Sequence, residues 1–404
     1  MGTNQFVAVR AGVSQVTMQE AVHWIDRDEA LARLGIKSQT LYAYVSRRRI
    51  AARPDPNNPR RSLYAVGDIA RLTGLDPTDI PGVLLSPDGL NGRTISIASH
   101  LTTLSGGRLL YRGRETVQWA QSSTLEDTAG LLWDARDVDL FQDIEPRRDL
   151  QPGLTSRARL FTALARRAQE DPGTNGRAHH DRLQFAATAL NEAIDAVAGL
   201  GPRLRFHQRL GRGWKVVERE QHILRRALVL VADNPMDAAI LATRVTASSH
   251  ASPAAAAMAG LVTLPHSPTA VQIEHASAYL QSARRNPAGA ASQRLQALGA
   301  VPGFGDPAWP HGDPRAHDLI VHANLPADLS AIVDAGQQIS GHPPTLAMAL
   351  ALVARKLDLQ QDGAVNLYLI GRLVGLMGHA LDQALNGSPI TARVRYVGPM
   401  PGAN

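Results

Sequence analysis

The chain has 404 residues, a length at which we expect two or three domains. It has no cysteine, which excludes disulfides and thiolate metal sites. Its formal net charge is +6, but lysine occurs only three times, so arginine carries almost all of the positive charge. The charge therefore indicates a nucleic-acid partner only where arginines cluster. Aromatic residues make up only 4% of a chain rich in alanine, leucine and arginine, and this balance favours helices over sheets.

The N-terminal segment MGTNQFVAVRAGVSQ has no basic stretch followed by an apolar one, which argues against a secretion signal. The longest nearly apolar run, residues 254–264, is shorter than the roughly 20 residues that span a bilayer. We therefore expect a cytoplasmic protein with no membrane partner.

Residues 26–50, DRDEALARLGIKSQTLYAYVSRRRI, predict two short helices. Asp28 is expected to cap the first, Gly35 to end it, and Ser38 to cap the second. The PDPNNP turn, a return strand at 60–64 and a third helix at 66–72 then predict a basic hairpin followed by a helix. This order resembles the winged helix-turn-helix of MerR-type DNA-binding domains, which we place at residues 22–75.

Six arginines lie within fifteen positions after the second predicted helix, opposed only by Asp55. Such a cluster can neutralise DNA phosphates, and the first residues of a recognition helix can reach base edges. The residues expected to contact DNA are Gln39, Thr40, Tyr42, Arg47, Arg48, Arg49, Arg60 and Arg61. The alternative is that these arginines form a solvated basic face on a small helical domain that no longer binds DNA or that contacts another protein.

A linker is predicted at 76–90, and the body of the chain follows at 91–400. Short strands are expected at 93–97, 107–111 and 393–397, and helical periodicity covers most of the remainder. The predicted helices span 155–169, 182–198, 218–231, 236–249, 253–264, 270–283, 325–340, 346–357 and 364–385. His179 and His180 are adjacent on a predicted polar loop, a spacing that does not favour chelation, so no metal site is expected.

Five blocks of this body appear in an order and spacing that resemble the citrate synthase family. They are LLYRGRETVQWAQSSTLEDTAGLLWDA (109–135), ADNPMDAAILATRVTASSHASP (232–253), VPGFGDPAWPHGDPRAHDL (301–319), GRLVGLMGHALDQ (371–383) and RVRYVGPMPG (393–402). The resemblance implies a homodimer of mainly α, two-domain subunits, with a smaller mobile domain at roughly 265–365. It also implies a dicarboxylate ligand and acetyl-CoA as a substrate or ligand, with no tightly bound cofactor.

The resemblance also assigns binding residues. Arg315 and Arg372 match two arginines with which the family clamps substrate carboxylates, a role suited to a planar and always charged fork. A third arginine of the family is replaced by Thr391. The coenzyme A segment matches Val301, Pro302, Gly303, Phe304 and Gly305.

The titratable groups of the family are largely replaced. Asp306 stands where a histidine polarises the oxaloacetate carbonyl, Asn234 where another histidine faces the substrate, and Thr345 where the catalytic carboxylate is expected. Thr269 takes the place of the enol-stabilising histidine in a gapless alignment, whereas a three-residue deletion would put His266 there. Because each proton-transfer group contributes roughly 10²- to 10⁴-fold, ordinary citrate synthesis is not expected unless other groups substitute.

Three interpretations remain. The chain is a dimeric regulator that senses a ligand or binds DNA, or an acyl-CoA condensing enzyme of the citrate or 2-methylcitrate type that uses displaced groups such as His311 or His266. The third interpretation is a non-catalytic partner of an active paralogue. The structural alternative for Asp306 is that it pairs with Arg315 or Arg372 and so occupies the carboxylate clamp from within.

Overall fold

The computed structural model describes residues 24–391, with the exception of residues 35, 48, 56–57, 66–67, 70–82, 86–90, 94–96, 143, 150–152 and 154. The chain divides into two units, residues 1–97 and 98–404, which are described separately. Several predictions lie outside the described residues. They concern Arg48, the side chain of Arg60, the strand at 393–397, most of the linker and most of the helix at 66–72.

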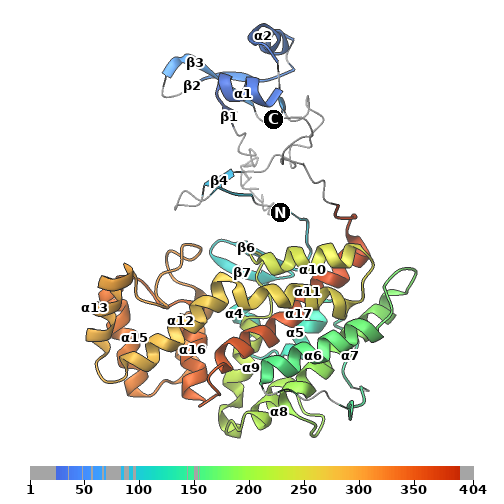
Figure 1. Cartoon of the computed structure of the whole chain (residues 1–404), viewed down its shortest axis with the longest axis vertical. Helices are drawn as coiled ribbons and strands as arrows, with labels where there is room; N and C mark the ends of the chain where they lie inside the picture. The colour runs from blue at the N-terminus through green and yellow to red at the C-terminus, as the bar shows by residue number, and fades with distance from the viewer. Residues whose placement is uncertain are drawn as a thin grey trace, which may run out of the picture. The chain divides into compact units, whose positions relative to one another are not determined.

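The N-terminal unit contains two helices and a hairpin where the sequence predicts them (Figure 1). Helix α1 (Arg27–Leu34) precedes α2 (Ser38–Ser46). Strand β2 (Ala52–Asp55) pairs antiparallel with β3 (Asn58–Ala65), and β3 also pairs with β1 (Trp24–Ile25). The buried core of this unit consists of Ile25, Ala30, Leu41, Ile50, Tyr64 and Ile69.

The N-terminal caps predicted for these two helices are wrong, whereas Gly35, predicted to end the first helix, lies outside the described residues. Asp26, not Asp28, caps α1, because its Oδ1 accepts a hydrogen bond from the backbone N–H of Glu29 at 2.9 Å. Ser38 is the first residue inside α2, and its hydroxyl accepts a hydrogen bond from the guanidinium of Arg27 at 2.7 Å. The helices begin one or two residues from the expected positions, so the predicted side chains do not meet the free N–H groups.

Two more small sheets are described. Strands β4 (Val83–Leu85) and β5 (Asn91–Arg93) pair antiparallel, so the predicted linker contains a strand. In the C-terminal unit, β6 (Thr102–Ser105) pairs with β7 (Arg108–Tyr111), which also pairs with β8 (Arg114–Glu115). The register places Thr102 opposite Tyr111, and both side chains take part in the network described below.

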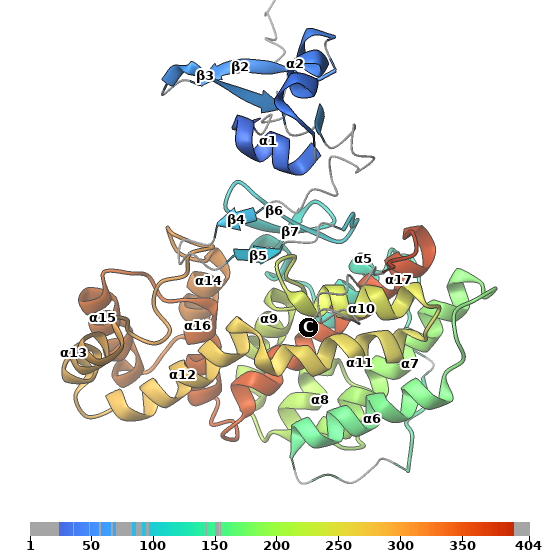
Figure 2. The ribbon, with the colours of Figure 1, turned by 45° about the horizontal axis from the view of Figure 1, so that its top comes forward.

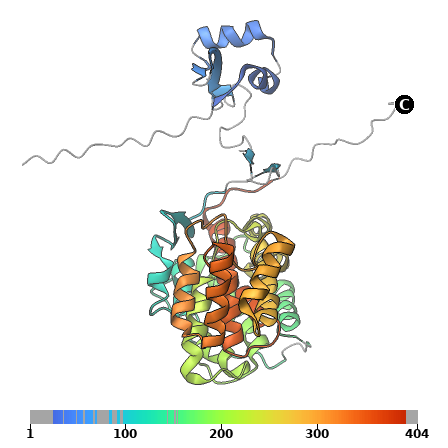
Figure 3. The same cartoon turned by 90° about the vertical axis from the view of Figure 1, so that its left-hand side faces the viewer.

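Helices make up most of the C-terminal unit, which confirms the mainly α fold class (Figure 3). They are α4 (Thr116–Trp119), α5 (Leu125–Leu132), α6 (Ser156–Glu170), α7 (His179–Ala198), α8 (Phe206–Gly213), α9 (Gln221–Leu230), α10 (Ala238–Ser248), α11 (Pro253–Thr263), α12 (Pro268–Ala283), α13 (Pro287–Leu298), α14 (Pro314–Ala323), α15 (Ala327–Ser340), α16 (Leu346–Lys356) and α17 (Gly363–Asn386). Figures 1 and 2 show α13 and α15 at one end of this unit and α6 and α7 at the other.

Local signals explain two helices that periodicity alone did not find. Helix α13 begins with Asn286 as cap and a proline at its first position, and it ends at Gly299 in the left-handed conformation. Helix α14 begins after Asp313, whose side chain accepts a hydrogen bond from the backbone N–H of Arg315. His179 and His180 are not on a loop, as predicted, but form the first residues of α7.

The C-terminal unit has two hydrophobic cores. The larger one extends from Leu101, just before β6, to α17. The smaller one lies among α12, α13, α15, α16 and residues 301–304, and includes Tyr279, Phe304 and Met348. By length and composition α17 could cross a membrane, but its apolar window is wholly buried. It packs against α9, α10, α11 and α16 as a core helix.

Glycines let the segment after α9 lie directly against α17. A Cβ on Gly371 would collide with Val231, and a Cβ on Gly375 would collide with Ala232 and Asp233. The backbone N–H of Gly375 instead donates to the carbonyl of Ala232 at 3.0 Å. This close approach fixes residues 231–233, which form part of the candidate site.

Candidate functional site

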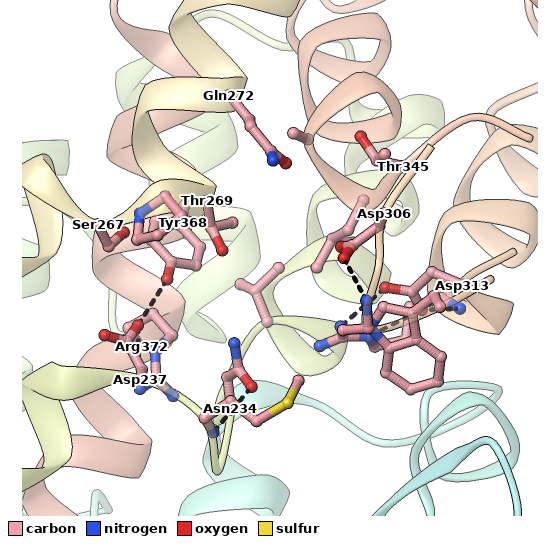
Figure 4. A pocket seen from close by; sticks show the side chains of 18 of the residues that line it. Asn234, Asp237, Ser267, Thr269, Gln272, Asp306, Asp313, Thr345, Tyr368 and Arg372 are labelled. Atoms are coloured by element: carbon pink, nitrogen blue, oxygen red, sulfur yellow. Dashed lines mark hydrogen bonds and ion pairs between the residues drawn. The ribbon is translucent and has the colours of Figure 1, made fainter. Parts of the chain in front are cut away.

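A cavity of about 450 Å³ opens in the C-terminal unit among the segment after α9, the start of α12, the loop before α14, the start of α16 and the middle of α17 (Figure 4). Seven residues singled out in the sequence all line it: Asn234, His266, Thr269, Asp306, Arg315, Thr345 and Arg372. The structure thus places these seven residues at one cavity, and their binding roles stay predictions.

Arg372 lies in the middle of α17 and is fully buried. Its Nη1 donates to Oδ1 of Asp233 at 2.5 Å, and its Nη2 lies 3.8 Å from Oδ2 of Asp237. Its Nε and Nη2 have no hydrogen-bond partner among the described residues. One edge of the guanidinium is therefore unoccupied, although the charge is partly balanced.

Asp233 connects the cavity to a buried polar network. Its Oδ2 accepts hydrogen bonds from Thr102 at 2.5 Å and from Nε2 of His379 at 3.0 Å. Burial alone would raise the pKa of Asp233, but His379, Arg372 and Thr102 outweigh it and hold this pKa well below its usual range. Asp233 is thus an anion that its surroundings fully satisfy.

The network continues behind Asp233. Nε of Arg244 donates to Nδ1 of His379 at 3.1 Å. Nε2 of His379 therefore carries the ring proton and donates the hydrogen bond to Asp233. Arg244 also donates to Asp382 at 2.5 Å, and Nδ1 of His100 lies 3.0 Å from the other carboxylate oxygen of Asp382. Hydrogen-bonded polar groups therefore extend from the cavity to the exposed side chain of His100.

Arg315 is paired much more completely than Arg372. Its Nε and Nη2 donate to the two carboxylate oxygens of Asp313 at 3.0 and 2.8 Å. The same carboxylate caps α14, and the guanidinium carbon of Arg315 lies 5.2 Å from the ring centre of Trp309. The edge that would bind a substrate carboxylate is therefore occupied from within.

Asp306 does not occupy the clamp, and the prediction that it pairs with Arg315 or Arg372 is wrong. Its Oδ1 accepts a hydrogen bond from the backbone N–H of Ala308 at 2.9 Å, and no ion pair joins it to either arginine in the part of the chain described. The turn that follows holds the Asp306 carboxylate on its own loop. Asp313 pairs with Arg315 instead, and Asp233 pairs with Arg372. Asp306 is half-buried and faces the cavity.

The remaining walls contain neutral polar groups. Tyr368 donates to Oδ2 of Asp237 at 3.0 Å, and burial raises the pKa of Tyr368 to about 12. Thr345 caps α16 and donates to the carbonyl of Gly303 at 3.2 Å, so its hydroxyl is already engaged. Asn234, Thr269 and Gln272 are also at the cavity (Figure 4). Four further residues that line the cavity were not predicted from the sequence as site residues: Asp237, Gln272, Trp309 and Tyr368.

A second cavity of about 390 Å³ adjoins the predicted coenzyme segment. Val301, Phe304 and Gly305 line it, whereas Pro302 and Gly303 are not among its lining residues. Asp306 and Trp309 line both cavities. The loop that carries the coenzyme segment thus also separates the two cavities.

Several of the predicted residues are exposed. His266 and His311 are exposed, and His311 is not among the residues that line either cavity. In the N-terminal unit, Gln39, Thr40, Tyr42, Arg47, Arg49 and Arg61 are all exposed. Arg53 lies with its guanidinium carbon 4.5 Å from the ring centre of Trp24. A basic surface is thus present, and DNA binding stays a prediction.

Comparison with known proteins gives one consistent result. Residues 89–395 match the model of the family "Citrate synthase, C-terminal domain". Among solved structures, citrate synthase from Thermoplasma acidophilum, in complex with carboxymethyl coenzyme A and oxaloacetate, is 17% identical with a TM-score of 0.60, covering 75% of this chain and 94% of that one.

Two further citrate synthases are similarly related. The Thermotoga maritima enzyme is 18% identical with a TM-score of 0.56 and covers 75% of this chain and 94% of its own. The Pyrobaculum aerophilum enzyme is 18% identical with a TM-score of 0.59, and the match covers 79% of this chain and 95% of that one. At these identities the structural likeness establishes the fold alone. A search of curated proteins gave no significant match.

Proposed function

The chain belongs to the citrate synthase family, and we propose that its C-terminal unit is a small-molecule-binding domain that regulates a DNA-binding N-terminal unit. The observation that carries this proposal is the state of the two cavity arginines. Arg315 is closed by Asp313, and Arg372 is paired with Asp233. A cavity in which a protein carboxylate fills the fork of one arginine and another carboxylate partly neutralises the second arginine is poorly suited to a dianionic substrate.

The charge of the cavity supports the same conclusion. Two arginines line it against four aspartates, Asp233, Asp237, Asp306 and Asp313. Two unit charges 4 Å apart interact by about 4 kcal/mol at an effective dielectric constant of 20. Surplus negative charge therefore opposes a second carboxylate, and no histidine stands at the Asn234, Asp306 or Thr345 positions to compensate.

The enzymatic test is a steady-state assay with acetyl-CoA or propionyl-CoA and oxaloacetate that follows the release of free thiol. We expect no turnover above the uncatalysed rate. Turnover on the order of 1 s⁻¹, within the ordinary range of enzymes, would overturn the regulatory proposal.

The alternative function, an acyl-CoA condensing enzyme, is favoured by one specific observation. Asp306 lines both the arginine cavity and the cavity beside the coenzyme segment. A general base for an acyl-CoA would have to stand between its thioester and the second substrate. If turnover is found, Asp306→Asn should lower kcat by at least about 100-fold, the ordinary contribution of such a base.

The DNA-binding half of the proposal rests on the exposed basic residues of the N-terminal unit. Fluorescence anisotropy with a mixed-sequence duplex should show binding that weakens steeply with salt. The double variant Arg47→Ala/Arg49→Ala should lose most of it. Arg284→Ala/Arg285→Ala removes the same charge from exposed residues of the C-terminal unit and is the matched control. Equal loss in both variants would contradict a specific DNA surface.

The assembly and location of the protein are part of the same proposal. We expect a cytoplasmic homodimer, because a two-fold protein presents two recognition helices to two half-sites. Sedimentation of the full chain tests the dimer, and a monomer at micromolar concentration would contradict it. Acetyl-CoA remains a proposed ligand of the second cavity, which isothermal titration tests.

A further inference from the structure

We propose that the arginine cavity binds a small zwitterion, a monocarboxylate that also carries an ammonium group, with its carboxylate at Arg372 and its ammonium at Asp306. The inference rests on the proposed function, because it names the class of ligand that the C-terminal unit would sense. It differs from the dicarboxylate that the family resemblance implies. Three features of the cavity lead to it.

The first feature is the unequal pairing of the two guanidinium forks. In Arg315 the Nε–Nη2 edge is filled by both oxygens of Asp313. In Arg372 the same edge has no hydrogen-bond partner among the described residues, although the side chain is fully buried and lines the cavity. Buried donors without acceptors are costly, and a carboxylate offers two acceptors at the spacing of this edge. The described cavity wall thus provides one open carboxylate fork instead of two.

The second feature is the position and pairing of Asp306. Asp233, Asp237 and Asp313 each accept a hydrogen bond from a side chain of arginine, tyrosine or histidine. Asp306 accepts one from a backbone N–H, that of Ala308. Figure 4 shows Asp306 on the side of the cavity opposite Arg372 and Tyr368. A ligand held by its carboxylate at Arg372 would therefore direct its other end toward a carboxylate.

The third feature is the neutral lining between these two poles. Thr269 and Gln272 are polar but uncharged, and Val231, Leu346 and Ala347 are apolar. A short aliphatic chain fits such a lining, and a cavity of about 450 Å³ lies within the usual size range of small-molecule sites. A second carboxylate on that chain would meet Asp306 and an arginine already closed by Asp313. An ammonium group would instead gain a charged partner.

The test compares ligands of equal length that differ only at one end. Isothermal titration of the full chain would use 4-aminobutyrate against succinate, and 5-aminopentanoate against glutarate. Butyrate and 1-aminobutane, which each carry one pole, complete the set. We expect each amino acid to bind at least about tenfold more tightly than the dicarboxylate of the same length, and more tightly than either single-pole compound.

Asp306→Asn tests the ammonium pole without disturbing a buried ion pair. It should weaken 4-aminobutyrate by about tenfold and remove the preference over succinate, since a charge-assisted contact is lost. Asp334→Asn, which changes an exposed aspartate of α15 that lines neither cavity, should leave both affinities unchanged. Arg372→Lys, which keeps the charge and removes the fork, should weaken all the carboxylate ligands.

Three results would overturn the inference: succinate binding as tightly as 4-aminobutyrate, an Asp306→Asn variant that keeps the wild-type preference, or no binding by any member of the set up to about 10 mM. These results leave the proposed function standing with another class of ligand. Failure of the proposed function would show separately, as thiol release in the condensation assay or as absence of DNA binding.

Discussion

The start of α14 and the middle of α17 each place one arginine in the wall of the same cavity, but they leave it in different states. The fork of Arg315 is closed on one edge by both oxygens of Asp313. Arg372 donates through Nη1 to Asp233, and among the described residues its Nε–Nη2 edge has no hydrogen-bond partner, only an ion-pair contact of 3.8 Å from Nη2 to Asp237. The Nε–Nη2 edge of Arg315 is thus filled by a carboxylate of the protein, whereas the same edge of Arg372 is the one that we propose as the ligand site.

The difference follows from where each carboxylate comes from. Asp313 stands two residues before Arg315 and caps the same helix, so the turn that positions the arginine also neutralises it. Asp233 comes from a distant segment and is shared with His379 and Thr102. A residue that matches a family motif is therefore not necessarily available for the chemistry of that motif. Its hydrogen-bond partners decide this.

The largest expected effect is the loss of the carboxylate beside Arg372. Asp233→Asn would leave a fully buried guanidinium without its main counter-charge, and removal of one partner from a buried pair costs about 3–5 kcal/mol. Urea denaturation followed by circular dichroism measures the change in the free energy of unfolding. Asp306→Asn, which breaks no ion pair in the described part of the chain, should stay within about 0.5 kcal/mol of wild type. Equal losses of unfolding free energy in the two variants would mean that Asp233 stabilises the fold no more than Asp306 does.

Opening the fork of Arg315 should cost less and change ligand preference. Asp313→Asn keeps a side chain that can cap α14 but loses the charge, and a hydrogen bond to a charged group contributes about 1.5–3 kcal/mol. We expect destabilisation of that size together with tighter binding of succinate, because a second carboxylate fork becomes free. Asp313→Ala removes the cap as well and should cost about 1 kcal/mol more. Unchanged succinate affinity in Asp313→Asn would show that the fork is not accessible.

The network behind Arg372 should appear in the acid dependence of stability. Burial favours the neutral acid, but hydrogen bonds from Asn386, Arg244 and His100 outweigh it and hold the pKa of Asp382 at about 2. Because an exposed aspartate titrates near a pKa of about 3.9, this carboxylate stabilises the fold by about 1–2 kcal/mol above that pH. The contribution is lost as the pH falls from about 4 toward 2.

The measurement is the difference in unfolding free energy between wild type and Asp382→Asn at several pH values. The difference should be largest above pH 4 and should narrow as the pH falls toward 2, since both proteins then lack the charge. A difference that is independent of pH would mean that the pairing with Arg244 and His100 does not stabilise the charged form of Asp382.

The smallest expected effect concerns the second aspartate near Arg372. Tyr368→Phe removes the hydroxyl that donates to Asp237 and should destabilise the chain by about 0.5–1.5 kcal/mol. Freed of this bond, Asp237 can move toward Nη2 of Arg372, which lies 3.8 Å away. The affinity for 4-aminobutyrate should then fall severalfold in titration. Unchanged affinity would indicate that Asp237 stays in place without the tyrosine.

Much of the fold could be predicted from local patterns in the sequence. Helical periodicity predicted α6, α7, α9, α10, α11, α12, α15, α16 and α17 in roughly the observed places. Helix α13 was missed because PAGAASQRLQAL has few large apolar residues to set a period. The signals were present in its caps, Asn286 and Gly299. Cap positions of α1 and α2 were wrong by one or two residues, since start signals alone do not fix a boundary.

The membership of the cavity was predictable, but its internal pairing was not. The family blocks brought Asn234, Thr269, Asp306, Arg315 and Arg372 together correctly. Which carboxylate meets which arginine depends on contacts between distant segments, as between residues 233 and 372, or on turn geometry, as at residue 313. The cavity contains four aspartates, and only the three-dimensional arrangement shows that Asp306 is the one for which the described residues provide no charged partner.

The glycines of α17 have a consequence for experiments that score mutations by phenotype. Gly371 and Gly375 have no side chain to offer a ligand, yet a methyl group at either position would push residues 231–233 away from the helix. In a saturation scan selected only for ligand response, both glycines should be as intolerant as Arg372 itself. Such a scan identifies a residue as functional when its substitution abolishes the response. Here it would also identify two glycines that contact no ligand and matter only because they leave room for residues 231–233.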